Sequence, residues 1–359
     1  MQSANRTRPG RGASFGHRQT VAAAAAVIAL TGLVVAVVGG TMMGGAPASQ
    51  TPSASHANSA ISPTGAAATA GYSASALPTI AATPLPTLKP TPPVPSLLAA
   101  IGDSYSQGYS VSPAYRGDHI GFSWVIGQTR KDGVLSLYER FRAVGGSPVI
   151  VDAATSGKKM NDAPRQANLV VGAAAKLKPG QTAYVTFELG TNDLCDDPKT
   201  DPAVFQQNLA TAVATLRAGL PSGSRILMLP VPDFGHFRDI TQADPVARAN
   251  LALPQNSNRC APYLGDNSPS TLAQADDYLA RYDATLEDAC REIAASDGPS
   301  GKLDCTYDAA RLGDADFRIA DLSTVDFFHP SLSGQAKMAA DAWAADAWAN
   351  VPIPKGANQ

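Results

Sequence analysis

A serine flanked by two glycines lies just after an apolar run in the first third of the chain. In SLLAAIGDSYSQG, Ser104 comes directly after the apolar stretch, where a serine hydroxyl could act as a nucleophile if a base took its proton. His329 is the candidate base, because DFFHP places Asp326 three residues before it. At this spacing in a turn, the carboxylate can reach the imidazole Nδ1–H and leave Nε2 free to accept the serine proton.

Other interpretations of these residues remain open. Gly-Asp-Ser is an ordinary turn sequence, and His329 followed by Pro330 would also suit the entry of a surface helix. His119 and His236 are expected to be loop or rim residues. Asp321 could take the place of Asp326, or the histidine could act without a carboxylate.

Two further turn residues follow apolar runs and could stabilise a developing negative charge. Asn192 in FELGTND has a side-chain amide, and Gly157 in AATSGKKMND has an accessible backbone N–H. Each is unremarkable alone. The joint occurrence of Ser, Gly, Asn and Asp/His after four separate predicted strands is much less probable by accident than any one of them.

These four segments, in this order, resemble the blocks of the SGNH (GDSL-type) hydrolase superfamily. Ser104 lies in the first block, Gly157 in the second, Asn192 in GTND in the third, and His329 in DFFHP in the last. The resemblance covers about residues 96–348. Tyr105 stands where the family's name motif has leucine, which alters a packing position.

The resemblance implies a fold and a mechanism. The fold would be a flavodoxin-like three-layer α/β/α sandwich around a central five-stranded parallel sheet. Ser104 would attack an ester carbonyl, His329 would serve as base and then acid, and Asp326 would orient it. The Ser104 N–H, the Gly157 N–H and the Asn192 side chain would form the oxyanion hole. Neither cofactor nor metal is implied.

The hydrophobic pattern independently predicts elements that could position these residues. Short apolar runs predict buried parallel strands at 96–102, 148–154, 182–190 and 225–231. A helix is expected just after Ser104, another from Asp201 to Leu220, and a third around Cys290. Strands alternating with helices indicate an open parallel sheet covered by helices on both sides.

The N-terminal part differs in composition from the rest. Residues 1–20 are basic, the uncharged stretch 21–43 is long enough to cross a bilayer, and 44–95 is rich in Pro, Ala, Ser and Thr. These features predict a cytoplasmic start, a membrane-spanning signal anchor and a disordered linker, followed by a hydrolase domain at 96–350 and a tail at 351–359. Alternatively, 21–43 is a signal peptide cleaved near Ala46-Pro47-Ala48, so that the protein is secreted.

Cysteines and charge agree with export. Two disulfides are expected among four cysteines, and chain order favours the pairs Cys195–Cys260 and Cys290–Cys305 out of three possible pairings. Without a C-x-x-C motif, a zinc site is not expected. Residues 96–359 carry 23 Lys and Arg against 30 Asp and Glu, which argues against nucleic-acid binding.

Three functions fit the sequence. The first is an extracytoplasmic carboxyl-ester hydrolase, of esterase, lipase or lysophospholipase type, acting on a lipid or on an acylated small molecule or glycan. The second is an acyltransferase that uses the same acyl-enzyme and passes the acyl group to or from a cell-envelope glycan. The third, a binding module without catalysis, is disfavoured because every catalytic position is filled.

Overall fold

The computed structural model describes residues 93–129, 131–265, 268–297, 301–308 and 317–354. Within these ranges, no helix combines the length and apolar character needed to cross a membrane. The predicted cytoplasmic start, the span at 21–43 and nearly all of the linker lie outside the described residues, as does the end of the predicted tail.

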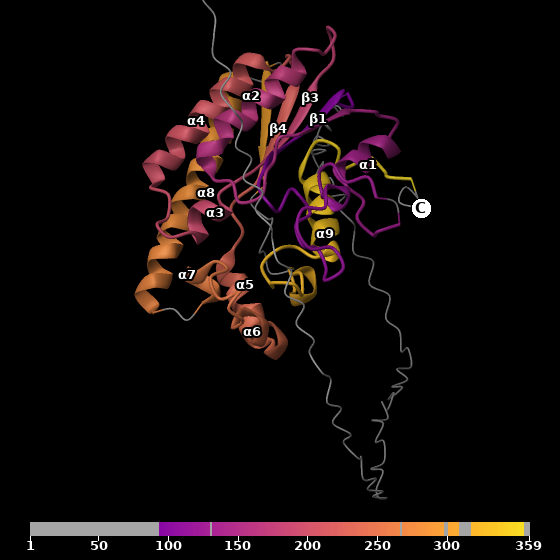
Figure 1. Ribbon diagram of the computed structural model, residues 1–359. Coiled ribbons are helices and arrows are strands. Elements are labelled where there is room, and N and C mark those ends of the chain that lie inside the picture. The colour runs from indigo at the N-terminus through magenta and orange to yellow at the C-terminus, as the bar shows by residue number, and fades with distance from the viewer. Residues whose placement is uncertain (1–92, 130, 266–267, 298–300, 309–316, 355–359) are drawn as a thin grey trace, which may run out of the picture. The chain divides into compact units, whose positions relative to one another are not determined.

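A five-stranded sheet forms the centre of the fold (Figure 1). Its strands follow in the order β2-β1-β3-β4-β5, and every neighbouring pair is parallel. The strands are β1 (Leu97–Gly102), β2 (Val149–Asp152), β3 (Ala183–Glu188), β4 (Ser224–Met228) and β5 (Leu303–Tyr307). The central five-stranded parallel sheet expected from the family resemblance is therefore confirmed.

Helices cover both faces of this sheet (Figure 1). Helices α2, α4 and α8 pack together on one face, and α1 and α9 contact one another on the other. The bounds are α1 Leu137–Ala143, α2 Ala163–Ala174, α3 Thr191–Cys195, α4 Pro202–Gly219, α5 Phe234–Ala243, α6 Pro245–Leu251, α7 Ala261–Leu264, α8 Pro269–Asp297 and α9 Leu332–Ala345. Short 3-10 turns lie at Ile120–Phe122, Met160–Asp162 and Ile319–Asp321.

Helix α4 forms for the reasons that its sequence predicts. The Asp201 side chain accepts a hydrogen bond from the Ala203 N–H at 2.8 Å, and proline occupies the first turn, where no donor is lost. Phe205 and other apolar residues of one stripe are buried, and the Phe205 ring stacks on Tyr282 of α8 with centroids 4.2 Å apart. This contact joins two helices of the same layer.

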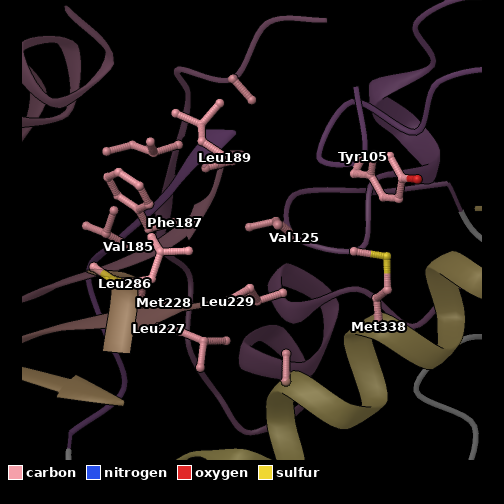
Figure 2. Close-up of a cluster of buried hydrophobic side chains, with 14 of the residues drawn as sticks. Tyr105, Val125, Val185, Phe187, Leu189, Leu227, Met228, Leu229, Leu286 and Met338 are labelled. Carbon is pink, nitrogen blue, oxygen red and sulfur yellow. The ribbon is translucent and has the colours of Figure 1, made fainter. Parts of the chain in front are cut away.

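The core fills the space between the sheet and both helix layers. Figure 2 shows Phe187 of β3 and Leu229, just after β4, in one buried cluster with Leu286 of α8 and Met338 of α9. Because successive strand residues point to opposite faces, a continuous apolar run such as that of β3 buries side chains in both layers. This explains why the central strands lack polar alternation.

Two expectations about local structure are wrong. The run 148–154 is not a buried strand: β2 is an edge strand that pairs only with β1, and Val149 is 61% exposed. No helix follows Ser104 either. Residues 103–110 form a series of turns, because the left-handed backbone of Gly108 (φ +60°) and Ser110 (φ +50°) cannot continue a right-handed helix.

The strand order creates the place where a site can form. The chain crosses from β1 outward to β2 and then back past β1 to β3, so the connections leave neighbouring strands β1 and β3 in opposite directions. Such a switch point opens a crevice at the carboxyl ends of the strands, where parallel α/β folds bind ligands. Ser104 follows β1 and Asn192 follows β3 at this point.

Two disulfides tie peripheral elements to this frame. Cys195 at the end of α3 is bonded to Cys260, just before α7, and Cys290 of α8 is bonded to Cys305 of β5. This is the pairing that chain order favours.

Candidate active site

The structure brings Ser104, His329 and Asp326 into one hydrogen-bonded chain. The Ser104 Oγ lies 2.9 Å from His329 Nε2, and His329 Nδ1 lies 2.7 Å from Asp326 Oδ2. With Nδ1–H donating to the carboxylate, Nε2 carries the lone pair and accepts from the serine hydroxyl. Serine and histidine are 225 residues apart in the chain, so the tertiary fold alone creates this contact.

The three side chains lie in surroundings with little water. Ser104 is 5% exposed, His329 2% and Asp326 1%. The imidazole ring packs against aromatic neighbours, with Tyr109 4.5 Å and Phe328 4.8 Å away between centroids. A low local dielectric strengthens the electrostatic interaction between the carboxylate and the imidazole.

A tight turn fixes Asp326 relative to His329. Asp326 Oδ1 accepts hydrogen bonds from the backbone N–H groups of Phe328 and His329, while Oδ2 faces the imidazole. Phe327 between them has φ +48°, an uncommon left-handed conformation that the surrounding turn imposes. Burial alone would raise the pKa of Asp326, but the positive charge of His329 and its hydrogen bonds hold this pKa below its ordinary value.

The alternative residues lie elsewhere. Asp321 accepts hydrogen bonds from Ser333 Oγ and the Arg318 N–H, so its carboxylate stabilises the turn before α9. His119 contacts the Arg116 carbonyl at the surface. His236 belongs to helix α5, where a loop or rim position was expected, and its Nε2 lies 2.7 Å from the Phe317 carbonyl.

Asn192 lies beside the nucleophile turn, on the short helix α3. Its Nδ2 donates to Asp103 Oδ2 at 3.0 Å and to the Lys158 carbonyl at 2.9 Å. Gly190 just before α3 has φ +135°, and a Cβ there would lie 2.4 Å from a Val231 methyl group. Only glycine allows the chain to enter α3 at this angle.

Gly157 lies in the loop after β2, next to the residue whose carbonyl contacts Asn192. It has φ +76°, with no atom close to the position of a Cβ, so the backbone conformation and not lack of space favours glycine here. The Thr155 N–H donates to the Gly102 carbonyl, which holds this loop against the end of β1. The loop thus connects the first and third predicted blocks.

Sequence reasoning assigned no function to the buried acids beneath the nucleophile turn. Asp103 is completely buried, and burial raises its pKa to about 7. Glu188 at the end of β3 accepts from Ser106 Oγ at 2.9 Å, and burial together with the charge of Asp103 raises its pKa well above the ordinary value. The motif contains Asp103, but a turn sequence alone does not indicate a buried carboxyl group.

Tyr105 does more than fill the packing position expected for it. Its ring is fully buried, and its hydroxyl donates to the Phe328 carbonyl at 2.7 Å. This bond joins the residue after the nucleophile to the residue before the base. A leucine at this position could not make it.

The segment containing α5, α6 and α7 contacts both sides of the site. Asn256 Nδ2 donates to the Val325 carbonyl, and Phe234 stacks on Phe328 with centroids 5.4 Å apart. At the other end of the segment, the Cys195–Cys260 disulfide joins it to α3. No sequence pattern indicated this arrangement, because its contacts bridge residues far apart in the chain.

This geometry can activate a serine hydroxyl. A base lies within hydrogen-bonding distance of the nucleophile, a carboxylate orients that base, and an amide and a glycine loop lie beside the nucleophile turn. These are the parts that acyl transfer through a covalent serine intermediate requires.

Comparison with known proteins gives one family match. The model of the GDSL-like lipase/acylhydrolase family matches residues 100–337, more than half of the chain. A search of curated proteins found no match.

Solved structures with a similar arrangement include several esterases. The psychrotrophic esterase EstA from Pseudoalteromonas sp. is 16% identical, with 70% of this chain and 96% of that chain covered and a TM-score of 0.41. The aryl esterase of M. smegmatis is 12% identical, with 67% and 93% covered and a TM-score of 0.38. The lipase/acylhydrolase from Enterococcus faecalis is 16% identical, with 68% and 91% covered and a TM-score of 0.36. Similarities this distant carry no information on the substrate.

Proposed function

Because the chain belongs to the GDSL-like lipase/acylhydrolase family, we propose that it hydrolyses carboxylic esters through an acyl-enzyme on Ser104. The observation that carries this proposal is the continuous hydrogen-bonded chain from Ser104 Oγ through His329 to Asp326. Such a chain supplies the nucleophile, the base and the group that fixes the tautomer of the base.

The proposed reaction has two halves. His329 Nε2 takes the hydroxyl proton as Ser104 Oγ attacks the ester carbonyl carbon. The tetrahedral intermediate then collapses, the alcohol leaves with the proton from His329, and the acyl group stays on the serine. Water then attacks the acyl carbon while His329 takes one of its protons; the bond to Ser104 Oγ breaks, His329 returns that proton to the serine, and the carboxylic acid is released. Asp326 stabilises the imidazolium in both halves.

The oxyanion of both intermediates would be held by the backbone N–H groups of Ser104 and Gly157 and by the Asn192 amide. The position of Asn192 beside the nucleophile turn and the connection of the Gly157 loop to the end of β1 support these assignments. Fixed donors stabilise the transition state because they need no reorientation as charge develops.

Replacement of the nucleophile tests this function. Ser104→Ala should lower kcat on p-nitrophenyl esters by about 10⁴-fold or more. Ser106→Ala is the matched control, since Ser106 is buried in the same turn but donates to Glu188, and it should retain most of the wild-type rate. A Ser104→Ala enzyme with more than about a tenth of wild-type kcat would refute the nucleophile assignment.

The same assay identifies the acyl group and the acceptor. A series of p-nitrophenyl esters of increasing chain length separates short-chain esterase from lipase specificity. Product analysis with and without an added glycan separates hydrolysis from acyl transfer. We expect free carboxylic acid as the main product; an acylated glycan would identify the acyltransferase instead.

We also propose that the catalytic domain lies outside the cytoplasm. Support comes from the two disulfides, which persist in oxidising compartments, and from the basic and apolar N-terminal sequence. Protease added to intact cells should degrade a membrane-anchored form, and a secreted form should appear in the medium. Full protection inside intact cells would contradict the proposal.

A further inference from the structure

The carboxyl group of Asp103 takes no part in the chain from Ser104 to Asp326, yet it contacts two parts of the site. Its Oδ1 accepts from the Tyr105 N–H at 3.0 Å, within the nucleophile turn. Its Oδ2 accepts from Asn192 Nδ2 at 3.0 Å and so links the segment after β1 to the segment after β3. The side chain is completely buried, so solvent does not compete for these bonds.

The contacts of Asn192 raise a question about the oxyanion hole. A side-chain amide carries two hydrogens. In this structure one faces Asp103 and the other faces the Lys158 carbonyl at 2.9 Å. An oxyanion at Ser104 must therefore take or share one of these two hydrogens.

Asp103 and the Lys158 carbonyl differ in the strength of the hydrogen bond they accept and in the segment of the fold that carries them. At a pH above its pKa of about 7, Asp103 is a carboxylate, and a bond to a carboxylate is roughly twice as strong as one to a neutral carbonyl. Asp103 directly follows β1, which pairs with strands on both sides, whereas Lys158 lies in the loop after the edge strand β2. The bond to the Lys158 carbonyl is the easier one to give up.

We propose that Asp103 is a positioning residue that keeps its hydrogen bond from Asn192 during the reaction, so that the hydrogen facing Lys158 is the one given to the oxyanion. This inference rests on the proposed ester hydrolysis at Ser104. At this Asn192 N–H the oxyanion replaces the Lys158 carbonyl as the acceptor, and no proton is transferred. Loss of Asp103 would leave the amide free to rotate away from the reacting carbonyl.

Asp103 could also act by another route, since its carboxyl group lies close enough to the Ser104 hydroxyl to influence its own pKa. A double-mutant cycle with Asn192 separates the two routes. If Asp103 acts through Asn192, its replacement should cost little once the amide is gone. If it acts through Ser104 or only on the fold, its replacement should cost the same factor in both backgrounds.

The experiment measures kcat and KM of Asp103→Asn, Asn192→Ala and the double variant on p-nitrophenyl acetate, at a pH above the pKa of Asp103. We expect Asn192→Ala to lower kcat by about 10²–10³ and Asp103→Asn by about tenfold or more, with KM little changed in both. In the Asn192→Ala background, Asp103→Asn should cost less than about threefold. Equal costs in both backgrounds, or an unchanged kcat for Asp103→Asn, would overturn the proposal.

Asp152 provides the matched control. Its carboxylate accepts from Gln107 Nε2 at 2.7 Å, so it also contacts the nucleophile turn, but its bond does not involve Asn192. Asp152→Asn should lower kcat by the same factor in the wild-type background and in the Asn192→Ala background. If Asp152 were coupled to Asn192 as strongly as Asp103 is, the double-mutant cycle would be measuring a general disturbance of the nucleophile turn. That result would overturn the inference.

A second variant protects the test against misfolding of Asp103→Asn. Asp103→Ser keeps an oxygen that can accept from the Tyr105 N–H two residues on, but it is too short to reach Asn192. It should lose as much kcat as Asp103→Asn while its circular dichroism stays that of wild type; wild-type kcat for a folded Asp103→Ser would contradict the inference. Full activity of Ser104→Ala would instead contradict the proposed function, so the two failures are distinct.

Discussion

Asp326 contacts His329 through two different oxygens, which explains how one side chain can both shape a turn and orient a base. Oδ1 accepts from backbone N–H groups and fixes the carboxyl plane, and Oδ2 is then aimed at the imidazole Nδ1. The assignment of Asp326 rather than Asp321 rests on this geometry, since Asp321 accepts from Ser333 and the Arg318 N–H instead.

We therefore predict that Asp326→Asn lowers kcat by about 10⁴ near neutral pH while the fold is retained, because the amide can donate to Nδ1 and favour the wrong tautomer. Asp321→Asn is the control and should have a mild effect. Kinetics across pH 6–9, with circular dichroism to confirm folding, checks both variants. An Asp326→Asn enzyme within about threefold of wild type would rule out the triad.

For single residues, the sequence indicated those candidate site residues that lie in recognisable motifs. Ser104, Asn192, Asp326 and His329 lie together as the motifs suggested. The contacts of Asp103 could not be predicted, because they depend on which strand lies beside β1. A sequence shows that an aspartate precedes the serine, but not that its carboxyl group is buried against α3.

Among the secondary-structure elements, strands were predicted where at least three apolar residues follow one another without interruption. The four apolar runs correspond to β1, β2, β3 and β4, and the caps of α4 were visible in the sequence. Strand β5 was not identified from its own residues, because Asp304 and Thr306 interrupt the apolar residues of Leu303–Tyr307, so that no continuous apolar run is present. The exposed position of β2 was missed because strand order is set by tertiary packing.

The two disulfides should affect the enzyme differently. We predict that replacing Cys195 and Cys260 by serine lowers the free energy of unfolding by about 4 kcal/mol, and replacing Cys290 and Cys305 by about 3 kcal/mol, since the closed loops span 65 and 15 residues. Only the first pair should also lower kcat, because Cys195 ends the helix that carries Asn192.

Urea unfolding and p-nitrophenyl acetate turnover, measured on both double variants, check this prediction. The Cys290/Cys305 variant serves as the control for a general loss of stability. Equal losses of kcat in the two variants would show that the link to α3 has no special importance for the site.

At the scale of the whole molecule, the buried acids make stability depend on pH. Below about pH 4 the Asp103 carboxyl holds its proton in both the folded and the unfolded chain. As the pH rises to about 7, the unfolded chain releases this proton first, so the free energy of unfolding falls. The raised pKa of Glu188 acts in the same direction.

We predict that Asp103→Asn, which cannot ionise, flattens this decline between about pH 4 and about pH 7. Denaturant unfolding of both proteins across that interval measures the two slopes, independently of any constant loss of stability in the variant. Identical slopes for Asp103→Asn and wild type would contradict the raised pKa.

The distance along the chain between Ser104 and His329 has a consequence for when the protein becomes active. A polypeptide is made from its N-terminus, so Ser104 is present early, whereas His329 follows 225 residues later. Until then the serine has no partner to take its proton. Under the proposed mechanism, a nascent or truncated chain that lacks His329 would therefore not cleave esters.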